Sequence, residues 1–295
     1  MIHFLKNLKI LKPIATGTQV DDRPIDGIKA VLFDIYGTLL ISSSGDIGSI
    51  NFKEKTVYKV LSEAGIIFSH SDAEENGKLV IQHYEQAIRY DHQEKRNCGI
   101  DHPEIEIIHI WDTCLKSLKN TGIIEKTKEL KLEHIAIELE CLTNPVYPMP
   151  GMKDCIEIIK SLDLKLGIIS NAQYFTRIIM NYFLKNELDM SYQIESFHPE
   201  LLIYSYEHHQ AKPGLFLYQL MKDRLQKHNL NPEECLYIGN DMLNDIYPAS
   251  QLGYKTVLFA GDKRSLRLRQ ERAELKALKP DRVITDLHQL FNILN

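Results

Sequence analysis

The hydrophobic and polar residues follow two different periodicities in the two parts of the chain. Between residues 45 and 145, apolar positions recur every three or four residues, which predicts amphipathic helices rather than strands. The first of these helices carries Val57, Val60 and Leu61 on one face and ends at Gly65. This region is therefore predicted to form a helical insertion.

Three further helices are predicted within the insertion. Ser71 and Glu74 have the spacing of a capping box, so the second helix is expected to begin there. The third helix is expected to start at Pro103, and the fourth is expected to cover residues 130–142. No strand is expected between them.

From residue 152 onward, apolar runs of strand length alternate with helical patterns. Such alternation predicts the α/β class, with a doubly wound, Rossmann-like parallel sheet. The runs that we expect to form its strands are 28–33, 165–169, 235–238, 255–259 and 282–284.

Composition favours a globular protein that acts on a small molecule. The 295 residues are 44% hydrophobic and carry a formal net charge of −5, so neither nucleic acid nor a membrane is expected as a partner.

Five cysteines without a CxxC pair indicate free thiols in a reducing cytoplasm. No apolar run reaches the roughly 18 residues of a membrane-spanning helix. A monomer and a homodimer are both compatible with these features.

Residues 1–27 precede the first strand and are predicted to be an N-terminal extension. Ile2, Leu5 and Leu8 recur at helical spacing between lysines, which would suit a basic amphipathic helix on a membrane surface. A short helix docked on its own domain, or a loose tail, is the commoner outcome. Turn-forming residues at 16–26 predict a linker, and the lysines exclude a signal peptide.

A basic run occupies residues 263–279. It contains four arginines, at positions 264, 267, 269 and 272. Such a run could bind phosphate or nucleic acid, but a single short run is more often the solvated face of a helix. A solvated helix is therefore predicted here.

Polar side chains follow three of the predicted strands. Asp34 ends the first strand, Ser170 ends the second, and Asp241 and Asp245 follow the third, while Lys212 lies just before a predicted helix. In open α/β sheets, ligands bind at the carboxyl ends of the strands. A carboxylate nucleophile, a hydroxyl, a lysine and a pair of acids are the groups that phosphoryl transfer uses.

The order of these residues resembles that of the haloacid dehalogenase-like (HAD) hydrolase superfamily, helical-cap type. The resemblance covers residues 28–295 and implies a cap that closes over the strand ends. Hinges are expected at 42–45 and 143–151, where glycine, serine and proline concentrate. The implied domains are an N-terminal extension (1–27), a HAD-like catalytic core (28–44 and 146–295) and a helical cap domain (45–145).

The resemblance also implies a role for each candidate residue. Asp34 would be the nucleophile that becomes an aspartyl phosphate, and Thr38 would pack behind it. Ser170 would donate its hydroxyl to a phosphate oxygen, and Lys212 would neutralise charge on the phosphoryl group and on Asp34. The implied substrate-binding residues are Tyr36, Gly37, Ser170, Asn171 and Lys212.

Mg²⁺ is the cofactor that the resemblance implies, because this ion takes oxygen ligands in near-octahedral geometry. Its ligands would be Asp34, the backbone carbonyl of Tyr36, Asp241 and Asp245. Family members often place the first loop acid directly after the glycine, where this chain has Asn240. We therefore expect Asp241 to be the first of the two Mg²⁺ ligands in this loop. Asp245, the second, follows the family pattern.

Tyr36 is the clearest departure from the phosphatase pattern. Family phosphatases carry an aspartate two residues after the nucleophile, which protonates the leaving group and then activates water. A phenol with an ordinary pKa of about 10 is a poor base at neutral pH. Because general acid–base help is worth about 10²- to 10⁴-fold in rate, alkyl phosphates are expected to react slowly.

Three functions remain compatible with this sequence. The first is a Mg²⁺-dependent phosphohydrolase acting on a small phosphorylated metabolite. The second is an L-2-haloacid dehalogenase, whose nucleophile loop carries the same tyrosine, although no arginine lies between Arg23 and Arg89 to cradle the halide. The third is a HAD-fold protein that binds a ligand without turnover. Asp241 and Asp245, the acids that follow the third of the predicted strands, favour the phosphohydrolase.

Overall fold

The computed structural model describes the chain apart from residues 1–4, 6–9, 45–51, 128–129, 192 and 195–196. It divides into two compact units. The core unit comprises Lys9–Ile47 and Val146–Asn295, and the helical unit comprises Met1–Leu8 and Gly48–Pro145.

The core unit is built on a six-stranded sheet whose neighbouring strands are all parallel. In spatial order its strands are β10 (Arg282–Ile284), β9 (Lys255–Phe259), β8 (Cys235–Gly239), β1 (Ala30–Phe33), β6 (Lys165–Ser170) and β7 (Leu202–Tyr204). This topology confirms the predicted doubly wound parallel sheet. The edge strand β7 was not predicted; it directly follows the 3₁₀ turn Pro199–Leu201 and not a helical pattern.

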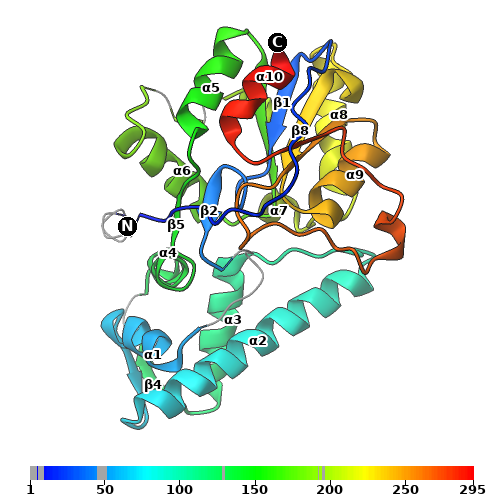
Figure 1. Ribbon diagram of the computed structural model, residues 1–295. Helices are drawn as coiled ribbons and strands as arrows, with labels where there is room; N and C mark the ends of the chain where they lie inside the picture. Colours follow the sequence, from blue (N-terminus) through cyan, green and yellow to red (C-terminus); the bar gives the residue numbers. More distant parts are fainter. Residues whose placement is uncertain (1–4, 6–9, 45–51, 128–129, 192, 195–196) are drawn as a thin grey trace. The chain divides into compact units, whose positions relative to one another are not determined.

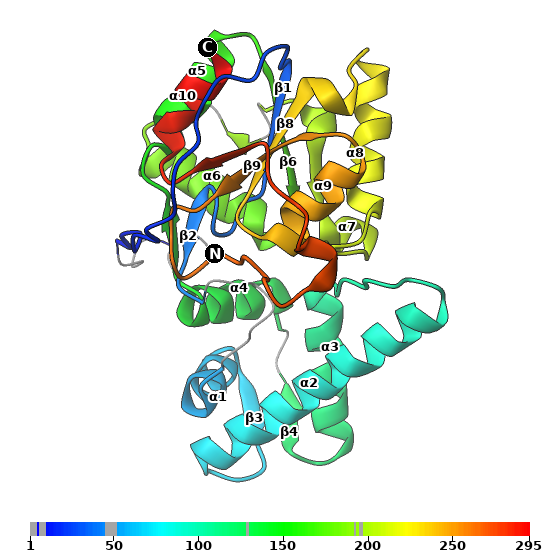
Figure 2. The same cartoon turned by 45° about the vertical axis from the view of Figure 1, so that its right-hand side comes forward.

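Helices cover both faces of this sheet (Figures 1 and 2). One face carries α5 (Met152–Ser161) and α10 (Leu290–Leu294), and the other carries α8 (Phe216–Lys227) and α9 (Tyr247–Gln251). Two further helices are α6 (Phe175–Asn186) and α7 (Ser205–His208). Short turns of 3₁₀ helix are η3 (Pro199–Leu201), η4 (Pro232–Glu234), η6 (Ala273–Leu275) and η7 (Leu287–Gln289).

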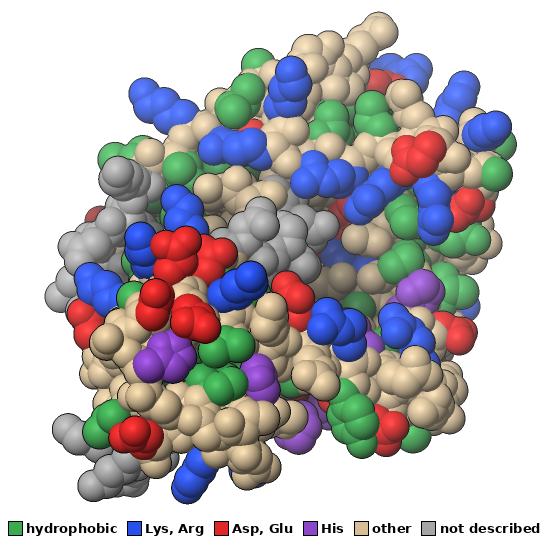
Figure 3. Space-filling model, turned by 90° about the horizontal axis from the view of Figure 1, so that it is seen from below, with side chains coloured by type: hydrophobic (Ala, Val, Ile, Leu, Met, Phe, Trp, Pro, Cys, Tyr) green, Lys and Arg blue, Asp and Glu red, His purple; other side chains and the backbone are tan. Residues whose placement is uncertain are grey.

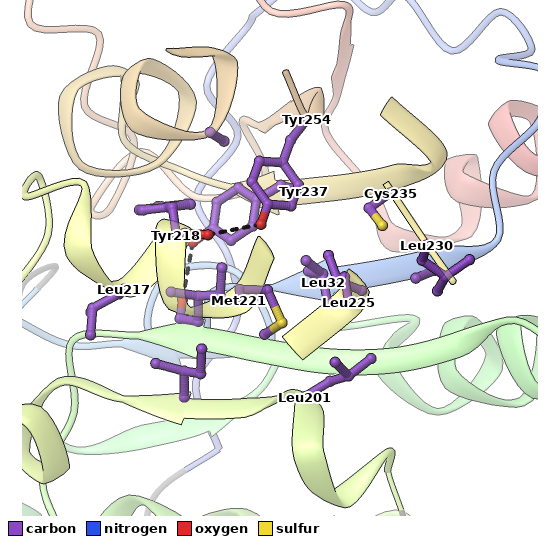
Figure 4. Packing of buried hydrophobic residues seen from close by; sticks show 14 residues of the cluster. Leu32, Leu201, Leu217, Tyr218, Met221, Leu225, Leu230, Cys235, Tyr237 and Tyr254 are labelled. Atoms are coloured by element: carbon purple, nitrogen blue, oxygen red, sulfur yellow. Dashed lines mark hydrogen bonds between the residues drawn. The ribbon is translucent and has the colours of Figure 1, made fainter. Parts of the chain in front are cut away.

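Beneath α8, the second face packs as a continuous hydrophobic cluster (Figure 4). Leu217 and Met221 of α8 are fully buried against Leu32 of β1 and Tyr237 of β8. Central parallel strands are covered on both sides, so their sequences are apolar throughout. This packing fixes the strand ends at which the candidate residues lie.

The chain enters and leaves the core unit through a short antiparallel ribbon. Strand β2 (Leu40–Ser42) pairs with β5 (Val146–Pro148), in the register Leu40 to Pro148 and Ser42 to Val146. Both predicted hinge segments therefore contain strand residues. Residue 45 lies outside the described part of the chain.

The segment of residues 10–27 belongs to the core unit, and the predicted linker at 16–26 leads into β1 without a helix or strand of its own. Asp21 forms an antiparallel bridge with Val283, next to the sheet edge. The Ile25 amide donates a hydrogen bond to the Ile293 carbonyl at 2.9 Å. Turn-forming residues here allow an extended path along the core. The predicted amphipathic helix falls mainly on residues outside the described ranges.

The predicted solvated helix at 263–279 is also wrong. This segment contains a single 3₁₀ turn, η6, and its Arg267 backbone pairs instead with the loop that follows β8. The Arg267 amide donates to the Asn240 carbonyl at 3.0 Å, and the Met242 amide donates to the Arg267 carbonyl at 2.9 Å. These contacts are distant in sequence, so a local charge pattern could not predict them.

The helical unit contains four helices: α1 (Glu54–Glu63), α2 (Ala73–Asn97), α3 (Ile107–Asn120) and α4 (Leu132–Thr143). It also contains an antiparallel pair, β3 (Ile66–Phe68) and β4 (Ile124–Thr127). The prediction of an all-helical insertion is therefore wrong. The β-branched and aromatic residues of β3 suit a strand, but three residues are too short to show alternation.

Two helix starts in this unit also differ from the predictions. The N-cap of α2 is Asp72 rather than Ser71, and its carboxylate accepts hydrogen bonds from the Glu74 and Glu75 amides. Helix α3 begins after Glu106, not at Pro103, because the Glu106 carboxylate accepts from the Ile108 and His109 amides. Both caps satisfy amides that a helix start leaves unpaired.

The surface carries charges of both signs. Figure 3 shows acidic and basic side chains interspersed on the face that it presents, in keeping with a net charge of −5. Within the described ranges, no helix is both long enough and apolar enough to cross a bilayer.

Candidate active site

Asp34 lies directly after β1, at the carboxyl end of the sheet. Its amide donates to the Ile238 carbonyl of β8 at 2.9 Å, which fixes the backbone between two strands. The side chain is almost fully buried, with 6% of the residue exposed. The tight turn that follows is anchored on the Ile35 carbonyl, which accepts from the amides of residues 38, 39 and 40.

The two oxygens of the Asp34 carboxylate have different surroundings. Oδ1 accepts hydrogen bonds from the Ser170 hydroxyl at 2.8 Å and from the Lys212 ammonium at 2.7 Å. Oδ2 accepts none from the residues that the structure describes. Ser170 and Lys212 are buried, so water does not compete for these bonds. The carboxylate is thus held by one oxygen, and the other remains available to react.

Lys212 is the cationic centre of the site. Its ammonium bridges Asp34 and Asp245, at 2.7 and 2.6 Å, and lies 3.3 Å from the Tyr237 hydroxyl. Burial alone would lower the pKa of Lys212, but the charges of Asp245 and Asp34 outweigh burial and raise it above its ordinary value. Lys212 is therefore positively charged at neutral pH.

Asn171 holds the Lys212 backbone. Its Oδ1 accepts from the Lys212 amide at 2.8 Å, and its Nδ2 donates to the Lys212 carbonyl at 3.3 Å. The following Lys212–Pro213 peptide bond is cis. Both ends of the Asn171 amide are thus engaged in placing the lysine, and the binding of substrate by Asn171 stays a prediction.

Asp245 lies on the π-helical turn η5 (Met242–Ile246) after β8. Its Oδ1 contacts Lys212, and its Oδ2 accepts from the Asp241 amide at 2.9 Å. Gly239 leaves the room that this carboxylate needs, because a Cβ there would lie 2.3 Å from the Asp245 Cγ. Burial raises the pKa of Asp245; Lys212 opposes the rise, and the charges of Asp34 and Asp241 add to it.

Asp241 is bound by an arginine that the sequence analysis did not select. Arg269 donates from Nη2 to Asp241 Oδ2 at 2.7 Å and from Nε to Oδ1 at 3.3 Å. Asp241 Oδ1 also caps the following turn, accepting from the Leu243 and Asn244 amides. A signal for Arg269 was present, since it belongs to the basic run, but its partner lies 28 residues away.

Gly37, Thr38 and Asn240 form a packed layer beside the carboxylates. The Thr38 hydroxyl donates to Asn240 Oδ1 at 3.1 Å, and Asn240 Nδ2 donates to the Ser265 carbonyl at 2.6 Å. Gly37 has φ +88°, and a Cβ there would lie 2.6 Å from the Ser265 Cβ. These contacts link three segments: the turn after Asp34, the loop after β8 that carries Asp241 and Asp245 (the acidic loop), and the basic run.

Tyr36 points its hydroxyl at the start of α6. The phenol oxygen lies 2.9 Å from the Thr176 hydroxyl, and Tyr36 is 7% exposed. Thr176 belongs to the first turn of α6, which follows the Ser170 strand. The hydrogen bond ties the nucleophile loop to that helix.

The residues that would hold Mg²⁺ do not fit the ion in this arrangement. Among the described residues, no group of three or more His, Cys, Asp or Glu side chains gathers closely enough to hold a metal ion. Lys212 joins Asp34 to Asp245, and Arg269 covers both oxygens of Asp241. The charges that a metal would neutralise are met by two protein cations.

Comparison with known proteins points to a single family. The family model of haloacid dehalogenase-like hydrolases matches residues 28–253. The Rhythmically expressed gene 2 protein of Drosophila melanogaster is 31% identical over 101 residues, which are 34% of this chain. The match covers 35% of that protein's own length.

The chain was also compared with solved structures. A 2-haloacid dehalogenase from Pseudomonas syringae pv. Tomato DC3000 matches 89% of this chain and 96% of its own, with a TM-score of 0.53 and 18% identity. A HAD phosphatase from Thermococcus onnurineus matches with the same coverage, a TM-score of 0.49 and 20% identity. At 18% identity, the likeness to the 2-haloacid dehalogenase shows the fold alone.

Proposed function

Because the chain belongs to the haloacid dehalogenase-like hydrolases, we propose that it hydrolyses a small phosphorylated metabolite, with Asp34 as the nucleophile. The observation that carries this proposal is the asymmetry of the Asp34 carboxylate. Oδ1 is fixed by Ser170 and Lys212, whereas Oδ2 has no hydrogen bond from any described residue. A nucleophile held in this way is oriented without being blocked.

The proposed reaction has two steps. Asp34 Oδ2 forms a bond to phosphorus while the bond from phosphorus to the leaving oxygen breaks, which yields an aspartyl phosphate. Water then attacks phosphorus and releases inorganic phosphate and the Asp34 carboxylate. Lys212 and the Ser170 hydroxyl lie beside Asp34, where they can also stabilise charge on the phosphoryl oxygens.

The proposed substrates have leaving groups that depart without protonation. The phosphatase aspartate is replaced by Tyr36, whose hydroxyl is hydrogen-bonded to Thr176. A phenol in this position is a poor base at neutral pH. Aryl and acyl phosphates are therefore the proposed class, ahead of alkyl phosphates.

Mg²⁺ is the proposed cofactor, because Asp34, Asp241 and Asp245 offer the oxygen ligands that this ion prefers. When bound, the ion would neutralise charge on the phosphoryl group. Since the side chains do not fit the ion as they are arranged here, no step above depends on it.

Dehalogenation is the second candidate. In that reaction Asp34 Oδ2 would displace halide from carbon, and water would then hydrolyse the resulting ester. Halide needs neither a proton nor a metal to depart. Each of the three carboxylates is already paired with a protein cation, Lys212 or Arg269, and this supports the alternative.

A substrate panel distinguishes the candidates. Aryl, acyl and alkyl phosphates and 2-haloacids would be tested with Mg²⁺ and with EDTA, and released phosphate and halide would be measured. Phosphate release is expected. Halide release alone would establish the second candidate, and no turnover across the panel would favour a binding protein without catalysis.

A further inference from the structure

Arg269 reaches the acidic loop through a segment that is fixed to that loop. The Arg267 backbone bonds to Asn240 and Met242, on both sides of Asp241. These two bonds set the position of Arg269, two residues further along the chain. The contact between Arg269 and Asp241 is therefore built into the fold rather than made by a loose side chain.

The guanidinium engages both oxygens of Asp241. Nη2 donates to Oδ2 at 2.7 Å and Nε donates to Oδ1 at 3.3 Å. The Asp241 side chain is 7% exposed and the Arg269 side chain 30%, so solvent screens this pair less than an exposed one. Two-point contacts of arginine with a carboxylate are among the stronger ion pairs in proteins.

A divalent cation and Arg269 would need the same carboxylate. Mg²⁺ binds its oxygen ligands at about 2.0–2.1 Å. An ion on Asp241 would lie beside the guanidinium, and like charges repel strongly where solvent screening is weak. Removing the arginine would take away the cation that pairs with Asp241, whereas Lys212 already pairs with Asp34 and Asp245.

We propose that Arg269 is a built-in counter-ion that competes with Mg²⁺ for Asp241. The ion binds when the guanidinium releases this carboxylate, so Arg269 sets the concentration of Mg²⁺ at which the site fills. This inference rests on the proposed function in one respect, because it takes Asp241 as a ligand of Mg²⁺.

The test is calorimetric titration of the full chain with MgCl₂ at constant ionic strength. Replacing Arg269→Gln removes the charge, and Arg269→Lys keeps the charge but loses the two-point contact. We expect Arg269→Gln to lower the Kd for Mg²⁺ at least about tenfold and Arg269→Lys to lower it less. The matched control is Arg272→Gln, because Arg272 is half exposed and pairs with Glu274; its Kd should stay within about twofold of the wild type.

Asp241→Asn supplies the second comparison. In that background Arg269→Gln should no longer tighten binding, because the shared carboxylate is gone. If Arg269→Gln lowered the Kd for Mg²⁺ equally in the wild-type and Asp241→Asn backgrounds, the arginine would act through its general electrostatic field and not through Asp241. That result would overturn the proposal. So would an unchanged or weaker affinity in Arg269→Gln, or no binding of Mg²⁺ to that variant.

Melting curves in EDTA verify that each variant is folded. Should Arg269→Gln fail to fold, Arg269→Lys carries the same test, and a Kd equal to or above that of the wild type overturns the proposal. The proposed hydrolysis is tested separately through Asp34 without a metal titration, so failure of one proposal is distinguishable from failure of the other.

Discussion

At the scale of single residues, the site is defined by how Lys212 divides its hydrogen bonds. One ammonium bridges Asp34 and Asp245, and all three side chains are buried. Removing one partner from a buried ion pair leaves charge without compensation, which costs about 3–5 kcal/mol. Lys212 therefore contributes to stability as well as to the proposed reaction.

Lys212→Gln is accordingly expected to lower the melting temperature, by roughly 6 °C or more at about 2 °C per kcal/mol. It should also abolish turnover of the best panel substrate. Lys263→Gln is the matched control, because Lys263 is exposed and its change should have little effect. A Lys212→Gln protein that melts like the wild type would contradict the assigned charge balance.

Tyr36 gives a second prediction at this scale. Since the phenol is hydrogen-bonded to Thr176, we expect it to position the loop rather than to transfer protons. The wild type should turn over aryl phosphates far faster than alkyl phosphates, and Tyr36→Phe should keep that ratio. Tyr36→Asp should raise alkyl phosphate turnover, by up to about 10²-fold. Equal aryl and alkyl rates in the wild type would show that another acid serves the leaving group.

At the scale of secondary structure, the surrounding pattern of the chain decided which strands the sequence could predict. Strands β9 and β10 have the predicted bounds, because each lies where the alternation of helices and strands in the core predicts a strand. Strands β3 and β7 have three residues each and were missed. The basic run was misassigned because its structure depends on Asn240, Asp241 and Met242, which lie outside any local window.

The start of α2 tests the assignment of its cap. Asp72→Ala removes an acceptor for two helix amides and should cost the helical unit about 1 kcal/mol of unfolding free energy. Ser71→Ala should change stability by less than about 0.5 kcal/mol. Urea unfolding of both variants measures the difference. A larger loss in Ser71→Ala would restore the cap predicted from sequence.

His288 links η7 to α5 and makes stability depend on pH. Its ring nitrogens lie 2.8 Å from Asp154 Oδ2 and 2.6 Å from Asp286 Oδ1. Hydrogen bonds to Asp154 and then to Asp286 raise the pKa of His288 above its ordinary 6.5. The stabilising contribution is therefore fully present below that ordinary pKa and is lost as pH rises through the raised value.

We expect His288→Gln to lower the melting temperature by about 1–2 °C at pH 5.5, since exposed pairs contribute about 0.5 kcal/mol. The deficit should vanish at pH 9, where the wild-type imidazole is neutral. Asp154 and Asp286 remain in both proteins, so melting curves at the two pH values isolate the histidine. A deficit that is equal at both pH values would rule out protonation as its cause.

At the scale of the whole molecule, the sequence predicted the Rossmann-like core and the order of its strand-end residues. Asp34, Ser170, Lys212 and Asp245 come together as that order implied. What the sequence did not predict is how charge is balanced among them. The partner of Asp241 became evident only once the chain had brought residues 241 and 269 together.

Covalent attack by Asp34 is the central step of the proposed hydrolysis. The most direct measurement is acid quenching of the enzyme during turnover of its best phosphorylated panel substrate, followed by mass spectrometry of the tryptic peptide 30–53, which contains Asp34. We predict a phosphoryl group on Asp34 that hydroxylamine removes, as it does from acyl phosphates. It should be absent from a folded Asp34→Asn protein, which should also be inactive. Turnover by that variant, or a phosphoryl group on another residue, would contradict the account.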